Sequence, residues 1–141
     1  MTFEEWEQQV PEQIKRDPVW RFLGYRKALH LSDLAWEDTE KMLRDLRGAE
    51  LTKQLIRSAG SISANVEEGY GRGYGKDRDY FLRVALGSAR ETRGRYYRAR
   101  HFLSEIVLEH RLNLSSEIVA LLVSELENQR QYRATQRPEH R

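Results

Sequence analysis

A glycine-rich segment, GYGRGYG at residues 69–75, holds residue types that could bind phosphate. A P-loop needs the pattern G-x-x-x-x-G-K-[ST] after a strand, but here Gly75 and Lys76 are followed by Asp77, and a helical pattern precedes the segment. We therefore interpret it as a connection between two helices, in which glycines take positive φ angles. A second interpretation stays open, in which its side chains contact nucleic acid by stacking on bases and pairing with phosphates: Tyr70, Arg72, Tyr74 and Lys76.

Histidines and acidic residues could form a metal site inside a helical bundle. A di-iron site needs two Glu-x-x-His pairs and further glutamates, and no histidine of this chain has a glutamate three residues before it. His101 and Glu105 are four residues apart, which on a helix is typical of a surface hydrogen bond. Glu67 and Glu68 would point about 100° apart on a helix, so they do not form an acid–base pair. The sequence predicts a non-catalytic protein without a metal or cofactor.

The strongest functional pattern lies between residues 76 and 101. One face of a helix there would carry basic residues with tyrosines between them, over about 35 Å: Lys76, Tyr80, Arg83, Gly87, Arg90, Gly94, Tyr97, Arg98 and His101. Such a row is typical of a surface that binds a polyanion. We predict the following nucleic-acid-binding residues: Arg72, Lys76, Arg83, Arg90, Arg93, Arg98, Tyr74 and Tyr97.

The charge distribution agrees with this prediction. The net charge is only +2, but residues 72–101 hold nine basic and three acidic groups, and residues 1–20 hold two basic and five acidic groups. Arginines outnumber lysines 19 to 5, and the planar guanidinium suits phosphate and carboxylate. The alternative is an ion-paired surface, for which the acidic N-terminal residues are one available partner.

Small residues suggest a second use of the same helices. Glycines seven residues apart would let another helix pack closely against the basic row, and small residues also line the helix before the glycine-rich segment. We predict an oligomer whose interface contains Gly60, Ser61, Ala64, Gly87 and Gly94.

Length and composition favour one cytoplasmic domain. A chain of 141 residues buries roughly two-thirds of its unfolded surface. No window approaches about 18 uncharged apolar residues, so we predict no membrane span. The N-terminus is acidic and does not resemble a signal peptide. The chain has no cysteine and therefore no disulfide framework.

Apolar residues recur every three or four positions, which indicates helices. We predict helices at residues 3–16, 19–47, 49–68, 77–110 and 115–133. The clearest seam is Leu82, Ala85, Ala89, Thr92, Tyr96, Ala99, Leu103 and Ile106. Asp17-Pro18 would end the first helix, Gly48 would end the second, and Ser115 would cap the last, with Leu114 and Val119 as its hydrophobic staple.

These elements predict an all-α fold, an up-down antiparallel four-helix bundle. The bundle would span residues 19–134, preceded by a short helical appendage at residues 1–18 and followed by a frayed tail at residues 135–141.

The segment LTKQLIRSAGSISANVEEGYGR, followed by YFLRVALGSARET, resembles the four-helix-bundle family of the 23S rRNA intervening-sequence proteins, which includes the accessory variability determinants of diversity-generating retroelements. The resemblance covers roughly residues 21–130. Two positions depart from it, because the family usually has proline at Ser63 and a small residue at Glu67. It implies a ring-like homopentamer without an established enzymatic role. In the retroelement branch it implies a basic surface that engages nucleic acid and a reverse transcriptase.

Our leading hypothesis is therefore a non-catalytic, oligomeric protein that binds RNA or DNA, as an accessory to the reverse transcriptase of a diversity-generating retroelement. The alternative is a structural or protein-interaction bundle with no nucleic-acid role.

Overall fold

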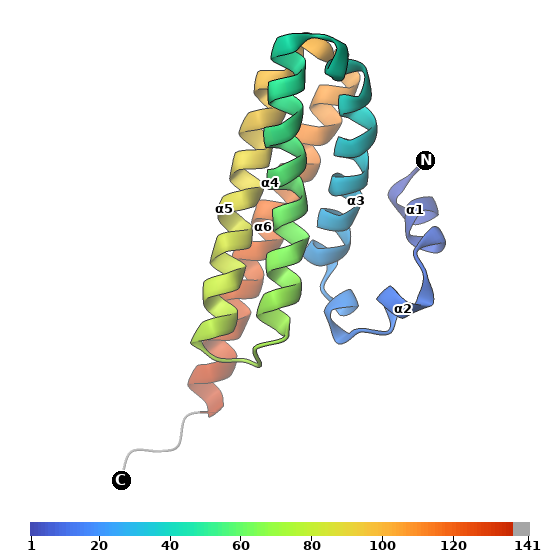
Figure 1. Cartoon of the computed structure of the whole chain (residues 1–141). Coiled ribbons are helices and arrows are strands. Elements are labelled where there is room, and N and C mark those ends of the chain that lie inside the picture. The colour runs from blue at the N-terminus through green and yellow to red at the C-terminus, as the bar shows by residue number, and fades with distance from the viewer. Residues whose placement is uncertain (137–141) are drawn as a thin grey trace.

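The structure is a computed structural model that describes residues 1–136, and this range contains no strand. Four long helices pack side by side in alternating directions (Figure 1): α3 (Leu23–Thr39), α4 (Leu46–Tyr70), α5 (Lys76–Arg98) and α6 (Glu105–Gln136). Two short helices precede them: α1 (Phe3–Gln9) lies beside α3, and α2 (Glu12–Lys15) contacts the 3-10 helix Pro18–Arg21. The prediction of an all-α four-helix bundle is confirmed.

The predicted seam of α5 forms the centre of the core. Leu82, Ala85, Ala89, Thr92 and Tyr96 are completely buried. The facing residues of the other helices are buried as well: Leu31 and Ala35 of α3, Leu55, Ala59, Ile62 and Val66 of α4, and Ile118 and Leu122 of α6. A core shared by all four helices explains why they stay together, since each helix buries one apolar stripe.

Small residues bring α4 and α5 close together. The hydroxyl groups of Ser61 and Ser88 are hydrogen-bonded at 2.9 Å, and Thr92 Oγ1 donates to Ser58 Oγ at 3.0 Å. Side chains this short can bond across the interface only if the two helix backbones lie near each other. Ser58 and Ser61 of α4 therefore serve a contact within the chain.

The predicted end of the first long helix was wrong. Helix α3 ends at Thr39, a 3-10 helix follows at Glu40–Arg44, and α4 begins at Leu46. Asp45 caps α4, because its side chain accepts hydrogen bonds from the backbone N–H groups of Arg47 and Gly48. Gly48 lies inside α4, where a Cβ atom would be 2.2 Å from the Met42 carbonyl oxygen. It permits a close approach and does not stop a helix.

The boundary between the last two helices was also misplaced. Helix α5 ends at Arg98, a 3-10 helix follows at Ala99–Phe102, and α6 begins at Glu105. Ser104 acts as the cap, since its Oγ accepts from the Val107 N–H at 3.2 Å. Ser115, the predicted cap, lies within α6 and donates to the Arg111 carbonyl at 2.8 Å. Ile106, the last residue of the predicted seam, is 84% exposed.

Residues 1–21 form an arm that is anchored on α3. Pro11 divides the predicted helix 3–16 into α1 and α2. Trp6 is buried and donates from Nε1 to Asp33 Oδ2 at 2.7 Å. Glu7 pairs with Arg26 at 2.6 Å. Within residues 1–136 the acidic arm therefore pairs with α3, not with the basic residues of α5.

The C-terminal end of α6 continues beyond the predicted helix. Residues 135 and 136, part of the predicted frayed tail, belong to α6, whereas residues 137–141 of that tail lie outside the described residues. No helix within residues 1–136 has the length and apolar content needed to cross a membrane.

Candidate nucleic-acid interface

Helix α5 turns a row of basic residues to solvent. Lys76, Arg83, Arg90 and Arg98 are exposed. None of them takes part in the ion pairs found within residues 1–136. Spacings of seven and eight residues place neighbouring cations about 10–12 Å apart along the helix axis. We call the exposed side of α5 that carries these four residues the outer face of α5.

The buried seam of α5 fixes the orientation of this face. Because Leu82, Ala85 and Ala89 are completely buried, residues on the opposite side of the helix must point away from the bundle. Arg95 lies at the edge of the face and behaves differently. It pairs with Glu91 at 3.1 Å and donates to the Gln54 carbonyl at 2.9 Å.

Two tyrosines accompany the cations. Tyr80 is 61% exposed and Tyr97 is 53% exposed. The rings of Tyr80 and Phe81 are nearly perpendicular, with centroids 5.2 Å apart. The ring of Tyr97 has the Arg100 guanidinium 4.3 Å from its centroid. Exposed ring faces next to cations can stack on nucleobases.

Arg93 lies at the boundary between α5 and α6. It is partly buried, and its Nη1 donates to Ser116 Oγ at 3.2 Å. It has no carboxylate partner among the ion pairs of residues 1–136. Its charge therefore extends the outer face of α5 toward α6.

The glycine-rich segment holds its side chains against the bundle. Arg72 pairs with Glu68 at 2.6 Å, and its guanidinium lies 5.3 Å from the Phe81 ring centroid. Tyr74 packs on Tyr132, with ring centroids 4.7 Å apart. Gly73 is the one glycine with a positive φ, 80°. Arg72 and Tyr74 therefore have partners within the subunit, unlike Arg83 and Arg90, and their contact with nucleic acid stays a prediction.

Sequence reasoning missed Arg78, the residue that organises this segment. Arg78 is only 5% exposed and lies between the rings of Tyr70 and Tyr74, 4.1 and 4.3 Å from their centroids. It donates to the carbonyl oxygens of Gly69 and Tyr70, at the C-terminus of α4. A cation there complements the helix dipole. The sequence could have shown that Arg78 is buried, because it lies four residues before Leu82 and so on the same side of the helix as the buried seam.

The predicted interface residues differ in their surroundings. A Cβ atom at Gly60 or Gly87 would meet no atom within 4 Å, whereas at Gly94 it would lie 3.4 Å from Arg98 Nη1. Ala64 is exposed. Ser61 is already hydrogen-bonded to Ser88 within the subunit.

The chain was compared with known proteins. The model of the family described as 23S rRNA-intervening sequence protein matches residues 22–124. The chain is similar to the crystal structure of a protein with unknown function from the S23 ribosomal protein family of Bacteroides thetaiotaomicron VPI-5482. The two are 25% identical with a TM-score of 0.68, over 73% of this chain and 97% of that one. No curated protein matches the chain.

Proposed function

This chain belongs to the 23S rRNA-intervening sequence protein family, and we propose that it is a non-catalytic oligomeric protein that binds nucleic acid through the outer face of α5. One observation carries the proposal. Lys76, Arg83, Arg90 and Arg98 follow one exposed side of a single helix, and no carboxylate within residues 1–136 pairs with them.

The physical reason is counterion release. Cations that are not neutralised within the protein can replace the counterions condensed on a phosphate backbone, which favours binding and makes it depend on salt. The guanidinium forks of Arg83, Arg90 and Arg98 suit phosphate oxygens. Tyr80 and Tyr97 are exposed in the same row, where each could stack on an unpaired base for about 1–3 kcal/mol.

The proposal is tested by removing the three arginines together. The variant Arg83→Gln, Arg90→Gln, Arg98→Gln should bind a labelled oligonucleotide more weakly at low salt. The slope of log affinity against log salt should fall by about 2–3, because three phosphate contacts are lost. Fluorescence anisotropy across a salt series measures both quantities.

A matched variant distinguishes an effect of this surface from an effect of the protein's total charge. Arg16→Gln, Lys41→Gln, Arg44→Gln removes the same formal charge from exposed positions outside α5. It should leave the salt slope close to that of the original protein. Equal losses in the two variants, or no loss in either, would contradict the proposed surface.

The alternative function is a structural or protein-interaction bundle. The exposed apolar residues favour it, since Leu46 is 89%, Ile106 is 84% and Trp36 is 74% exposed. If the arginine variant bound oligonucleotides as tightly as the original protein, this alternative would be the better description.

The proposal also includes the finer properties that the family resemblance implies. We propose that copies associate into a homopentamer around Gly60, Ser61, Ala64, Gly87 and Gly94. The arginines of the outer face of α5 then lie at the rim of the interface, so that several such faces form one basic surface. We also propose that a reverse transcriptase is a partner. Light scattering should then give a mass of five times the 16.7 kDa chain. A mass of one chain at micromolar concentration would refute the oligomer, and co-purification with a reverse transcriptase encoded nearby would test the partner.

A further inference from the structure

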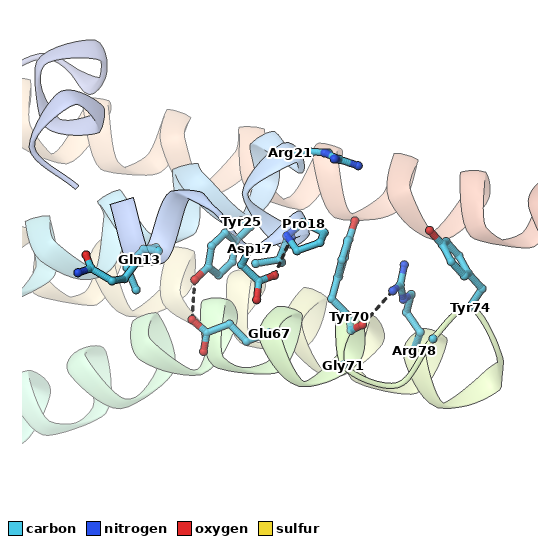
Figure 2. A pocket seen from close by; sticks show the side chains of 13 residues that line it. Gln13, Asp17, Pro18, Arg21, Tyr25, Glu67, Tyr70, Gly71, Tyr74 and Arg78 are labelled. Atoms are coloured by element: carbon cyan, nitrogen blue, oxygen red, sulfur yellow. Dashed lines mark hydrogen bonds between the residues drawn. The ribbon is translucent and has the colours of Figure 1, made fainter. Parts of the chain in front are cut away.

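A cavity of about 790 Å³ lies between the arm and the end of α4, and its lining reaches the first turn of α5 at Arg78 (Figure 2). This volume is in the range of small-molecule sites. Its walls come from α2, the 3-10 helix Pro18–Arg21, α3, α4, the glycine-rich segment and α5. Residues 13–21, which form one wall, precede the range matched by the family model. The cavity is therefore not built from the family-matched part of the chain alone.

One end of the cavity is acidic. Asp17 and Glu67 both line it, and neither takes part in the ion pairs of residues 1–136. Asp17 Oδ1 accepts from the Val19 N–H at 2.9 Å, and Glu67 Oε2 accepts from the Tyr25 hydroxyl at 2.6 Å. Both residues are exposed, and the second oxygen of each carboxylate has no donor within the described residues.

The pKa of Tyr25 is also affected by these two carboxylates. Burial raises the pKa of Tyr25, and the hydrogen bond to Glu67 and the charges of Glu67 and Asp17 raise it further. The tyrosine hydroxyl is therefore held as a donor to Glu67. A cationic group at this end would complement two carboxylates that take part in no ion pair within residues 1–136. Arg21 also lines the cavity but pairs with neither of them.

The other end is formed by Arg78, which is 95% buried. Its Nε and Nη2 donate to backbone carbonyl oxygens at 3.3 and 3.0 Å. Nη1 has no hydrogen-bond acceptor within residues 1–136, and no carboxylate there pairs with the guanidinium. Nη1 is not among the fully buried atoms that lack a partner, so it is open to solvent although the residue as a whole is buried. The unused donors of Nη1, at the wall of the cavity, suit an anionic group.

The Tyr70 ring separates the two ends. Figure 2 shows Asp17, Tyr25 and Glu67 on one side of this ring and Arg78 with Tyr74 on the other. The Tyr70 hydroxyl donates a hydrogen bond to Glu125, so this hydrogen is not available to a ligand in the cavity. A ligand that reached both ends would have to extend past the ring.

We propose that this cavity binds a small zwitterion whose ammonium group pairs with Asp17 and Glu67 and whose carboxylate accepts from Nη1 of Arg78. Because the ring stands between the two ends, the charges of the ligand are several bonds apart. An ω-amino acid or a dipeptide has this form, whereas an α-amino acid is too short.

The probe is 6-aminohexanoate, which carries an ammonium and a carboxylate group. Its controls are hexanoate, which has only the carboxylate, and hexylamine, which has only the ammonium group. Titrations followed by the amide NMR signals of residues 13–21 and 67–78 give the three affinities. Two charge-assisted contacts should make 6-aminohexanoate bind roughly tenfold more tightly than either analogue. Equal affinities for all three, or no shift with 6-aminohexanoate at millimolar concentrations, would overturn the proposal.

A double variant tests the acidic end without disturbing the fold. Asp17→Asn keeps an acceptor for the Val19 N–H, and Glu67→Gln keeps an acceptor for the Tyr25 hydroxyl. This variant should bind 6-aminohexanoate no more tightly than hexanoate. Glu50→Gln with Glu109→Gln removes the same charge from exposed positions outside the cavity and should bind like the original protein. Unchanged affinity in the Asp17/Glu67 variant would show that the carboxylates do not hold the ligand.

Discussion

The arginines of α5 and those of α6 have the same side chain but different surroundings. On the outer face of α5, Arg83 and Arg90 are exposed and lack a carboxylate partner within residues 1–136. In α6, Arg111 Nε and Nη2 donate to the two oxygens of Asp38 at 2.7 and 2.9 Å. Arg133 holds Asp79 with two bonds of 2.7 and 2.6 Å. The partner, and not the residue type, therefore distinguishes the arginines of the proposed binding surface from those that connect helices.

The paired arginines connect helices that are distant in sequence. Arg111 of α6 binds Asp38 of α3, and the same carboxylate accepts from the hydroxyl of Tyr96 in α5 at 2.7 Å. Burial raises the pKa of Tyr96, and the charge and hydrogen bond of Asp38 add to that shift. Three helices therefore meet at one carboxylate.

The largest expected effect comes from removing this carboxylate. Asp38→Ala leaves the Arg111 guanidinium and the Tyr96 hydroxyl without their acceptor, and the Asp38 side chain is only 9% exposed. Breaking a buried ion pair in this way should lower the free energy of unfolding by about 3–5 kcal/mol. Urea denaturation followed by circular dichroism measures the change.

The outer-face variant Arg83→Gln, Arg90→Gln, Arg98→Gln is the matched comparison for stability. Surface substitutions away from specific contacts usually change stability by about 0.5 kcal/mol or less each. If the outer-face variant lost as much stability as Asp38→Ala, the distinction between the two sets of arginines would be wrong.

His30 is a third case, a basic group that is buried without an acceptor. It is 4% exposed and packs against the rings of Phe3 and Trp6, and its Nδ1 has no hydrogen-bond partner among the described residues. Burial lowers the pKa of His30 to about 4. Three nearby cations lower it further and one carboxylate opposes them: His110, Arg111 and Lys27, and Asp33.

The pH dependence of stability follows from this shift. The unfolded chain binds the His30 proton near pH 6.5 and the folded chain only near pH 4. The contribution of neutral His30 to the stability of the fold is therefore fully present above pH 6.5 and is lost as the pH falls toward 4. When the pH is lowered from 6.5 to 5, the free energy of unfolding of the original protein should fall by about 1–2 kcal/mol more than that of the His30→Phe variant. Parallel losses in denaturation curves of the two proteins would contradict the assignment.

The sequence predicted the parts of this molecule that depend on local periodicity. The helices and the buried face of α5 followed from apolar spacing, and the outer face of α5 followed as its opposite side. Contacts between distant residues were not visible. The partner of Arg111 is 73 positions away in the chain. Gly48 was read as a helix end because its neighbour, the Met42 carbonyl, was not yet placed.

The cavity beside the arm shows the same limit. In the sequence, Asp17 was interpreted as part of a helix stop and Glu67 only as a member of a rejected acid–base pair, because each position was judged from its neighbours in sequence. Only the packing of the arm against α3 brings Asp17 to the cavity wall that Glu67 and Arg78 also line.

The substitution with the smallest expected effect tests whether the outer face of α5 is free of packing against other atoms. A Cβ atom at Gly87 would meet nothing within 4 Å, and glycine within a helix costs about 0.5–1 kcal/mol relative to alanine. Gly87→Ala should therefore raise the free energy of unfolding by that amount, measured at a concentration where light scattering shows single subunits. Gly94→Ala should gain less, because its Cβ would lie 3.4 Å from Arg98 Nη1. A loss of stability at Gly87 in single subunits would mean that this face is packed, and the unpaired arginines beside it would then need a different explanation from that of an open binding surface.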